Sequence, residues 1–252
     1  MRRAVNRTAA CLIALFVAAA AAASEKAELK RETLTSGGKQ RTYWLYVPDR
    51  APADPPRPLL LLLHGSTRNG ETLARPWKDL AAKEGIVLAG PDALDPRHWS
   101  SPTDGPAFLR DVVEDVKART PIDARRVLLF GHSDGACFAL AMGAFESGYF
   151  AAVAIHAGAF APEEFVNLDW ASRKIPYAIW IGTRDAYFPL DTVRATRDAL
   201  KARGFPVEYT EMPGHTHDYY GSAKEVNRMA WEFLKSQRLA AEAKYTPYGE
   251  SR

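Results

Sequence analysis

The stretch Val127-Leu128-Leu129-Phe130-Gly131-His132-Ser133-Asp134-Gly135-Ala136-Cys137-Phe138 decides the fold of this chain. At its centre is the pattern Gly-x-Ser-x-Gly, which follows an apolar run typical of a buried strand and precedes an apolar run typical of a helix. A turn this tight between a strand and a helix requires small residues two positions on either side of the serine. The pattern predicts a strained turn that holds the Ser133 hydroxyl at the carboxyl end of a strand, beside the N-terminus of the next helix.

The rest of the chain alternates short apolar runs with amphipathic segments. The expected strands are residues 42–47, 59–63, 86–89, 127–130, 151–155, 177–181 and 207–212. The expected helices are residues 72–84, 106–119, 136–142, 190–203 and 223–239. Strands that alternate with helices predict an α/β domain with a mainly parallel central sheet and helices on both faces. Ligands of such sheets bind outside the carboxyl ends of the strands, where Ser133 is expected.

The first 23 residues have the composition of an export signal. Three arginines precede an apolar run at residues 11–20, and an alanine tract ends before Ser24. This pattern predicts a cleaved signal peptide over residues 1–23 and a periplasmic or secreted protein. An uncleaved anchor is the alternative, although the run is short for a membrane span. A single domain is then expected over residues 24–252, with residues 24–40 forming an edge strand or a loose lead-in and residues 240–252 loosely ordered.

The charge of the chain gives no reason to expect a nucleic-acid partner. Three of its 33 Lys and Arg residues precede residue 24 and none of its 30 Asp and Glu residues do, so the remainder carries 30 of each. A neutral domain lacks the basic surface that binds phosphates. Cys137 is the only cysteine after residue 23 and is expected to be a small buried hydrophobic residue. Because cysteines and histidines are too sparse for a zinc site, no metal or cofactor is expected.

A serine hydroxyl becomes a useful nucleophile when a base takes its proton and an acid orients the base. After this kind of turn the acid and then the histidine follow the serine along the chain. Asp185 comes directly after the strand expected at 177–181 and is preferred over Asp191, which precedes a helix and suits an N-cap. His215 and His217 both follow the last expected strand. Their two-residue separation allows at most one of them to act as the base.

Two backbone N–H groups are expected to bind the negative oxygen that develops during acyl transfer. One is that of Asp134, directly after the serine, and the other is that of Ser66, in the loop after the strand at 59–63. The alternative for Gly65-Ser66 is an ordinary tight turn. His64 is expected to pin this loop through a hydrogen bond, and the Asp134 carboxylate to be structural at a helix N-terminus.

Aromatic residues on the expected carboxyl-end loops are candidates for the wall of a substrate pocket. They are Trp99, Tyr187, Phe188, Tyr219 and Tyr220. About twenty residues separate the strands at 151–155 and 177–181, too few for a large lid domain. The expected cleft is therefore open and suits a small-molecule or oligomeric substrate.

These motifs resemble the α/β-hydrolase fold and, within it, secreted serine esterases related to polyhydroxybutyrate depolymerases and feruloyl esterases. The resemblance covers roughly residues 40–238. It is based on Leu63-His64-Gly65-Ser66, Ile122-Asp123-Ala124-Arg125-Arg126-Val127, Gly131-His132-Ser133-Asp134-Gly135, Gly182-Thr183-Arg184-Asp185 and the histidine segment after residue 213.

The resemblance also bears on the choice of base. His217-Asp218-Tyr219-Tyr220 is similar to the His-x-Tyr-Tyr segment of S-formylglutathione hydrolases, whereas Gly214-His215-Thr216 is similar to the Gly-His-Thr-Trp segment of many depolymerase-like members. We favour His217 as the base and expect the His215 ring to line the pocket.

The resemblance implies a serine carboxylesterase that cleaves an ester by two-step acyl transfer, with Ser133 as nucleophile, His217 as base and Asp185 as the orienting acid. A peptidase or an acyltransferase on the same fold is the enzymatic alternative. A non-catalytic binding protein of the cell envelope that keeps the fold is the alternative from another class. The presence of all three candidate side chains favours an enzyme.

Overall fold

The computed structural model describes residues 27–49 and 55–246. The signal peptide predicted over residues 1–23 and residues 247–252 lie outside these ranges. Among the described residues, no helix combines the length and the apolar character that crossing a membrane would require.

The described residues form an eight-stranded sheet in the order β1-β2-β4-β3-β5-β6-β7-β8. The strands are β1 (Lys30–Ser36), β2 (Lys39–Tyr46), β3 (Arg57–Leu63), β4 (Val87–Pro91), β5 (Ile122–His132), β6 (Ala152–His156), β7 (Tyr177–Gly182) and β8 (Val207–Met212). The β1–β2 and β2–β4 pairs are antiparallel, and all other pairs are parallel. The prediction of a mainly parallel central sheet is confirmed.

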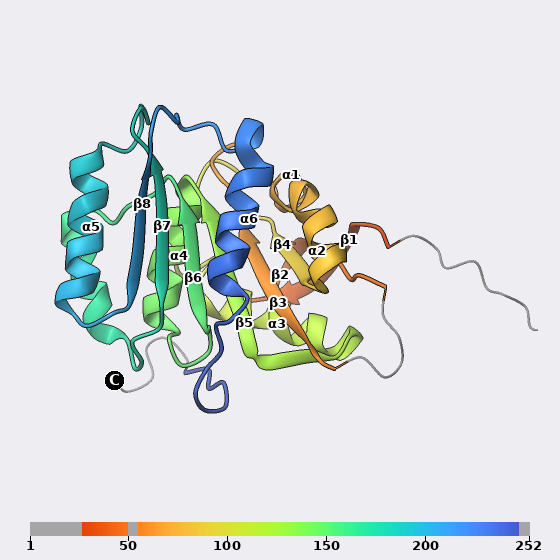
Figure 1. Ribbon diagram of the computed structural model, residues 1–252. Helices are drawn as coiled ribbons and strands as arrows, with labels where there is room; N and C mark the ends of the chain where they lie inside the picture. Colours follow the sequence, from red (N-terminus) through yellow and green to blue (C-terminus); the bar gives the residue numbers. More distant parts are fainter. Residues whose placement is uncertain (1–26, 50–54, 247–252) are drawn as a thin grey trace, which may run out of the picture.

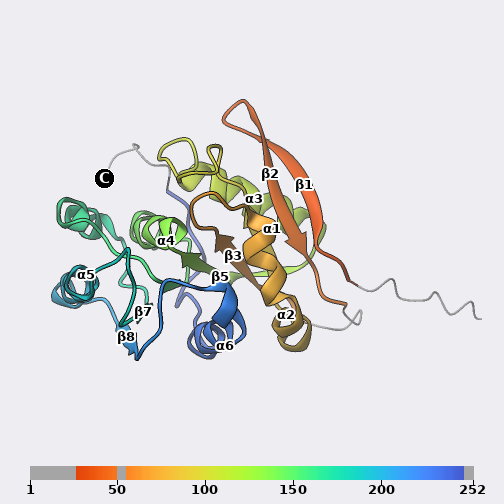
Figure 2. The same ribbon diagram turned by 90° about the horizontal axis from the view of Figure 1, so that it is seen from above.

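Helices cover both faces of this sheet (Figure 2). The α-helices are α1 (Gly70–Ala74), α2 (Lys78–Glu84), α3 (Pro106–Arg119), α4 (Asp134–Phe145), α5 (Leu190–Ala202) and α6 (Ala223–Leu234), and the 3₁₀ helices are η1 (Arg75–Trp77), η2 (Pro162–Trp170) and η3 (Tyr220–Ser222). Helices α1, α2 and α6 lie on one face, and α3, α4 and α5 lie on the other. The loops that follow β7 and β8 meet at one end of the sheet, at the top of Figure 1.

Two predicted helices differ from the observed ones. The helix expected at 72–84 is divided by the 3₁₀ turn Arg75–Trp77, because Pro76 has no N–H to continue an α-helical ladder. The helix expected at 223–239 ends at Leu234, and the chain then turns so that the Leu239 N–H donates to the carbonyl of Arg125 at 2.9 Å.

Residues 27–40 and 240–246 belong to the two terminal segments of the expected domain. Both are bonded to the rest of the domain. Residues Lys30–Ser36 form the edge strand β1 in register with β2. After α6, the Lys244 N–H donates to the Gly148 carbonyl at 2.8 Å. The edge strand is thus the one of the two expected forms that residues 30–36 adopt, and the described residues after α6 are bonded to the domain where a loose end was expected.

The core supports the strands on which the candidate site depends. All five leucines of 59–63 are fully buried, as expected for a central strand covered on both faces. Between β6 and β7 the chain forms η2 and connecting loops, so the prediction that no large lid domain is present is confirmed. The carboxyl end of the sheet is consequently open above Ser133.

Candidate active site

The turn between β5 and α4 has the strained geometry expected of Gly-x-Ser-x-Gly. Ser133 has φ 58° and ψ −123°, a backbone conformation that is rare for a residue with a side chain. A Cβ on Gly135 would lie 2.0 Å from the Leu63 carbonyl oxygen, and one on Gly131 would lie 2.2 Å from the Gly135 carbonyl oxygen. Close packing of α4 on β3 and β5 therefore requires both glycines and presses Ser133 outward.

Ser133, His217 and Asp185 form one chain of hydrogen bonds. The Ser133 Oγ lies 2.9 Å from Nε2 of His217, and Nδ1 of the same ring lies 2.8 Å from Oδ2 of Asp185. Because a carboxylate only accepts hydrogen bonds, the proton of the neutral ring is on Nδ1. The Nε2 lone pair then faces the Ser133 hydroxyl, which donates to it.

Asp185 is held in place from both sides of its carboxylate. Its Oδ1 accepts the backbone N–H groups of Tyr187 at 2.8 Å and Phe188 at 2.9 Å, and its side chain is fully buried. Asp191, the alternative acid, lies in the first turn of α5 with its side chain 95 % exposed and pairs with Arg194 at 3.1 Å. It is also not the N-cap, since that position is occupied by Pro189.

The ring of His217 is packed between other rings. The Tyr187 ring lies 4.6 Å from it, the His132 ring 5.0 Å, and the Phe188 ring stacks on it at 5.8 Å between centroids. This packing restricts the rotation of the imidazole. Both ring nitrogens are therefore kept aligned with Asp185 and Ser133.

His215 takes part in a different chain, made of three imidazoles. Its Nε2 lies 2.9 Å from Nε2 of His156, and Nδ1 of His156 lies 3.1 Å from Nδ1 of His132. Burial, with a smaller effect of neighbouring imidazoles, lowers the pKa of His132 to about 4 and lowers that of His156 further. His215 thus ties the loop after β8 to β6 and does not line the cavity beside Ser133, contrary to the sequence-based expectation.

The loop after β3 approaches Ser133 closely. A Cβ on Gly65 would lie 3.1 Å from the Ser133 Cβ, so the backbone at Gly65 packs against Ser133. Ser66 is the next residue along this loop. Within residues 27–49 and 55–246, neither the Ser66 N–H nor the Asp134 N–H donates to a protein acceptor. The loop after β3 and the start of α4, which meet at Ser133, therefore each provide one backbone N–H that is free to bind a ligand oxygen.

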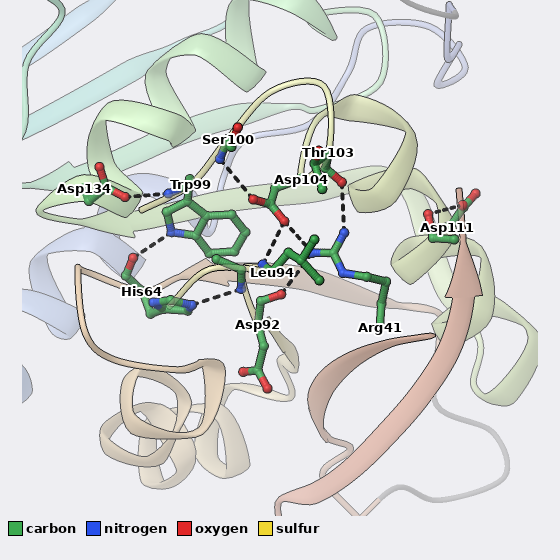
Figure 3. Close-up of polar contacts among 12 residues, drawn as sticks. Arg41, His64, Asp92, Leu94, Trp99, Ser100, Thr103, Asp104, Asp111 and Asp134 are labelled. Carbon is green, nitrogen blue, oxygen red and sulfur yellow. Dashed lines mark hydrogen bonds and ion pairs between the residues drawn. The ribbon is translucent and has the colours of Figure 1, made fainter. Parts of the chain in front are cut away.

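Trp99 connects these two segments (Figure 3). Its backbone N–H donates to Oδ2 of Asp134 at 2.8 Å, and its indole N–H donates to the His64 carbonyl at 2.8 Å. The Trp99 ring stacks on Phe138 at 4.9 Å and is buried. Trp99 consequently links the loop after β3 to the start of α4 and does not line the cavity that contains Ser133, which corrects its expected place.

His64 holds the same loop, as expected. Its Nε2 accepts the Ala93 N–H at 3.1 Å, which leaves the ring proton on Nδ1 to donate to the Gly65 carbonyl at 2.9 Å. Burial lowers the pKa of this ring, in keeping with a neutral imidazole. Burial has the opposite effect on an acid and raises the pKa of Asp134. The Asp134 carboxylate accepts the hydrogen bond from the Trp99 N–H.

A buried ion pair supports the loop that carries Trp99. Asp104 accepts the N–H groups of Leu94 at 3.0 Å and Ser100 at 2.9 Å, and pairs with Arg41 at 2.5 Å. The Arg41 guanidinium also donates to the carbonyls of Thr103 and Asp92 (Figure 3). The carboxylate and the guanidinium therefore satisfy loop groups that would otherwise be buried without partners.

A cavity of about 430 Å³ opens beside Ser133 and is lined by residues 65–68, 132–133, 187 and 217–220. Three of the five expected aromatic residues contribute to it, namely Tyr187, Tyr219 and Tyr220. Phe188 lies behind His217 instead, because it stacks on the imidazole. Arg68 and Asp218 also line the cavity, although sequence reasoning did not select them. Their position on loops after expected strands was the available signal.

Among residues 27–49 and 55–246, the thiol, carboxylate and imidazole groups form no metal centre. Burial raises the pKa of the Cys137 thiol to about 11, so it is not a thiolate at neutral pH. In the part of the chain that the structure describes, no three His, Cys, Asp or Glu side chains are arranged to hold a metal ion.

Comparison with known proteins supports the architecture. The chain is 33% identical over 141 residues to the putative esterase NocK of Nocardia uniformis subsp. tsuyamanensis, a match that covers 51% of this chain and 40% of that protein. The match therefore spans less than half the length of that relative.

Two solved structures show similarity of fold alone. The fluorophosphonate-binding serine hydrolase FphF of Staphylococcus aureus superposes with a TM-score of 0.70 at 15% identity, covering 83% of this chain and 99% of that one. A ferulic acid esterase superposes with a TM-score of 0.65 at 18% identity, covering 83% and 98%.

The family model described as phospholipase/carboxylesterase matches residues 108–235. This match runs from α3 through the serine turn to the end of α6, and so includes Ser133, Asp185 and His217. It spans half of the chain, and the protein belongs to the phospholipase/carboxylesterase family of the α/β-hydrolase fold.

Proposed function

We propose that this protein is a serine carboxylesterase that hydrolyses a small-molecule or oligomeric ester through an acyl-enzyme on Ser133. The observation that carries the proposal is the continuous chain from Asp185 Oδ2 to Nδ1 of His217 at 2.8 Å and from Nε2 of His217 to Ser133 Oγ at 2.9 Å. This geometry meets the requirement for a base within hydrogen-bond reach of the nucleophile and an acid that orients the base. Membership of the family supports an ester as the substrate.

In the first step Ser133 Oγ attacks the ester carbonyl carbon while Nε2 of His217 takes the hydroxyl proton. The ring then carries a positive charge, which the buried Asp185 carboxylate stabilises across a 2.8 Å hydrogen bond. Because the Tyr187 and Phe188 amides already hold this carboxylate, it does not need to reorganise during the reaction.

The negative oxygen of the tetrahedral intermediate binds to the Ser66 and Asp134 amides. Each preorganised donor of this kind is worth about 10²- to 10³-fold in kcat, because it interacts more strongly with the developing charge than with the ground-state carbonyl. The contact of Gly65 with Ser133 supports this assignment, since it brings the Ser66 loop against the reacting atom.

Collapse of the intermediate expels the alcohol, which takes its proton from Nε2 of His217. A water molecule then enters, His217 removes its proton, and the resulting hydroxide attacks the acyl carbon of the acyl-enzyme. The bond between the acyl carbon and Ser133 Oγ then breaks, which releases the carboxylic acid, and Nε2 of His217 returns its proton to Ser133 Oγ. All proton transfers use one imidazole, so the reaction needs no group beyond the chain and water.

The proposal includes export. Residues 1–23 would act as the signal peptide, and the protein would work in the periplasm or outside the cell. Residues 24–252 contain one cysteine, so no disulfide can form within this segment in the oxidising environment there.

The test is covalent labelling combined with turnover. The purified protein is expected to hydrolyse p-nitrophenyl acetate and butyrate, and a fluorophosphonate is expected to add one equivalent at Ser133 and abolish turnover. Peptide mapping by mass spectrometry locates the adduct. A folded protein that neither reacts nor turns over esters would contradict the esterase proposal and favour a binding protein. Preferential cleavage of a matched p-nitroanilide would favour a peptidase.

Trp99→Phe is expected to lower kcat by up to about 100-fold with little change in KM, since a small displacement of positioning groups is felt in the transition state. The substitution keeps the ring stacked on Phe138 but removes the indole N–H that holds the His64 carbonyl. Steady-state kinetics with p-nitrophenyl butyrate measure the effect. Trp170→Phe, on the exposed face of η2, is the matched control. An unchanged kcat in Trp99→Phe would show that the indole N–H has no part in aligning the two amides.

A further inference from the structure

We propose that the physiological ester carries a carboxylate that Arg68 binds inside the cavity beside Ser133. This inference rests on the proposed esterase function and names the class of its substrate. It starts from a charged side chain that lines the cavity and takes no part in the proposed proton transfers.

Arg68 belongs to the same turn as the Ser66 amide. Its backbone N–H donates to the Gly65 carbonyl at 3.2 Å, so the turn that presents Ser66 toward Ser133 also starts the Arg68 side chain at the rim of the cavity. A substrate whose carbonyl oxygen sits near Ser66 therefore passes close to this guanidinium.

The Arg68 guanidinium is held across the cavity by an aromatic ring. Its Cζ lies 4.8 Å from the centroid of the Tyr220 ring, which is within the range of a cation–π contact. The Tyr220 ring is itself in edge contact with the His132 ring, next to the nucleophile. Contact with the face of a ring leaves the in-plane N–H donors of a guanidinium available, and these are the donors that match a carboxylate.

No acidic side chain in the described ranges forms an ion pair with Arg68, in contrast to Arg41 and Arg194, which pair with carboxylates. The cavity wall contains one acidic residue, Asp218. Both of its oxygens lie 3.2 Å from the Gly221 N–H, so this carboxylate folds back on its own chain. Asp185 is outside the cavity lining, where its buried carboxylate is bonded to His217.

The site thus combines the Ser133 hydroxyl, two backbone N–H groups without a protein acceptor and the Arg68 guanidinium. Among the described residues no carboxylate forms an ion pair with this guanidinium. A charge-assisted, two-pronged contact of Arg with a carboxylate discriminates more strongly than a neutral hydrogen bond. We expect about a 10- to 100-fold preference in kcat/KM for an anionic ester over its neutral isostere, as such hydrogen bonds permit.

The experiment compares matched esters with wild type, Arg68→Gln and Arg68→Lys. One pair places the charge on the acyl side, as mono-p-nitrophenyl glutarate against its methyl ester. The other pair places it on the alcohol side, as the butyrate esters of 3-hydroxybenzoic acid and its methyl ester. Arg197→Gln, on α5, removes one positive charge from an arginine that pairs with Asp198 and serves as the control.

The expected result is a preference for the anionic member of at least one pair that falls with added salt. Arg68→Gln should remove about 10-fold or more of that preference, so that the anionic member loses more kcat/KM than the neutral one; Arg68→Lys should retain part of the preference, and Arg197→Gln should retain all of it. A wild type without preference in either pair, or an equal loss on both members in Arg68→Gln, overturns the inference. Hydrolysis of the neutral esters would in that case still support the proposed esterase function. Failure of every ester overturns both.

Discussion

His217→Ala is expected to lower kcat for p-nitrophenyl butyrate by about 10⁶-fold, the scale seen when the histidine of such a triad is removed. Among residues 27–49 and 55–246, no other side chain is hydrogen-bonded to Ser133 Oγ and able to take its proton, and Nε2 of His217 lies 2.9 Å from that oxygen. Without it, attack requires loss of the hydroxyl proton to water. Burst and steady-state kinetics, corrected for any contaminating activity with Ser133→Ala, measure the loss.

His215→Ala is the matched control, because this ring lies two residues away and contacts His156. We expect its kcat to stay within about 10-fold of wild type. Its free energy of unfolding should fall by about 1–3 kcal/mol, since Nε2 of the buried His156 loses its partner. Urea denaturation followed by circular dichroism measures this change. An inactive His215→Ala together with an active His217→Ala would reverse the assignment of the base.

Asp185→Asn is expected to lower kcat by about 10⁴-fold without unfolding the loop. Oδ1 of the asparagine can still accept the Tyr187 and Phe188 N–H groups, which determines that Nδ2 faces His217. An amide N–H can only donate to Nδ1, so the ring proton moves to Nε2 and the base can no longer accept a proton from Ser133.

The comparison with Asp191→Asn makes this test specific. Asp191 is exposed on α5 and should tolerate the change with kcat within about 2-fold, as surface substitutions usually do. Thermal unfolding of both variants should resemble that of wild type. Full activity in Asp185→Asn, or inactivity in Asp191→Asn, would exclude Asp185 as the orienting acid.

Much of the fold follows from local pattern. The amphipathic run at Pro106–Arg119 and the strand Val207–Met212 begin and end where the sequence predicts, because the hydrophobic period and the flanking residues determine their ends. The split of the helix at 72–84 was also encoded, in Pro76, but apolar periodicity extends across it. The length of α6 was misjudged because amphipathic residues continue past Leu234 into a segment that bonds to β5.

The histidines show where local pattern no longer decides. His215 and His217 occupy the same loop and have the same residue type, and only the resemblance of the residues after His217 to a His-x-Tyr-Tyr segment favoured one over the other. The difference arises from partners distant in sequence, since His156 on β6 binds one ring and Ser133 with Asp185 binds the other. The position of Trp99 also depends on residues distant in sequence. Trp99 was expected to line the substrate pocket, but its two N–H groups donate to the His64 carbonyl and the Asp134 carboxylate, and its ring is buried.

The sequence by itself determined the strained turn at Ser133, the parallel sheet that supports it and the order in which an acid and a histidine follow. These properties depend on backbone sterics and hydrophobic period, which act over a few residues. Only the tertiary structure decided which imidazole faces Ser133, that Trp99 links the segments of the two amides and that Arg68 borders the cavity without an acidic partner among the described residues. Such relations depend on hydrogen-bond distances between segments that meet only when the sheet assembles.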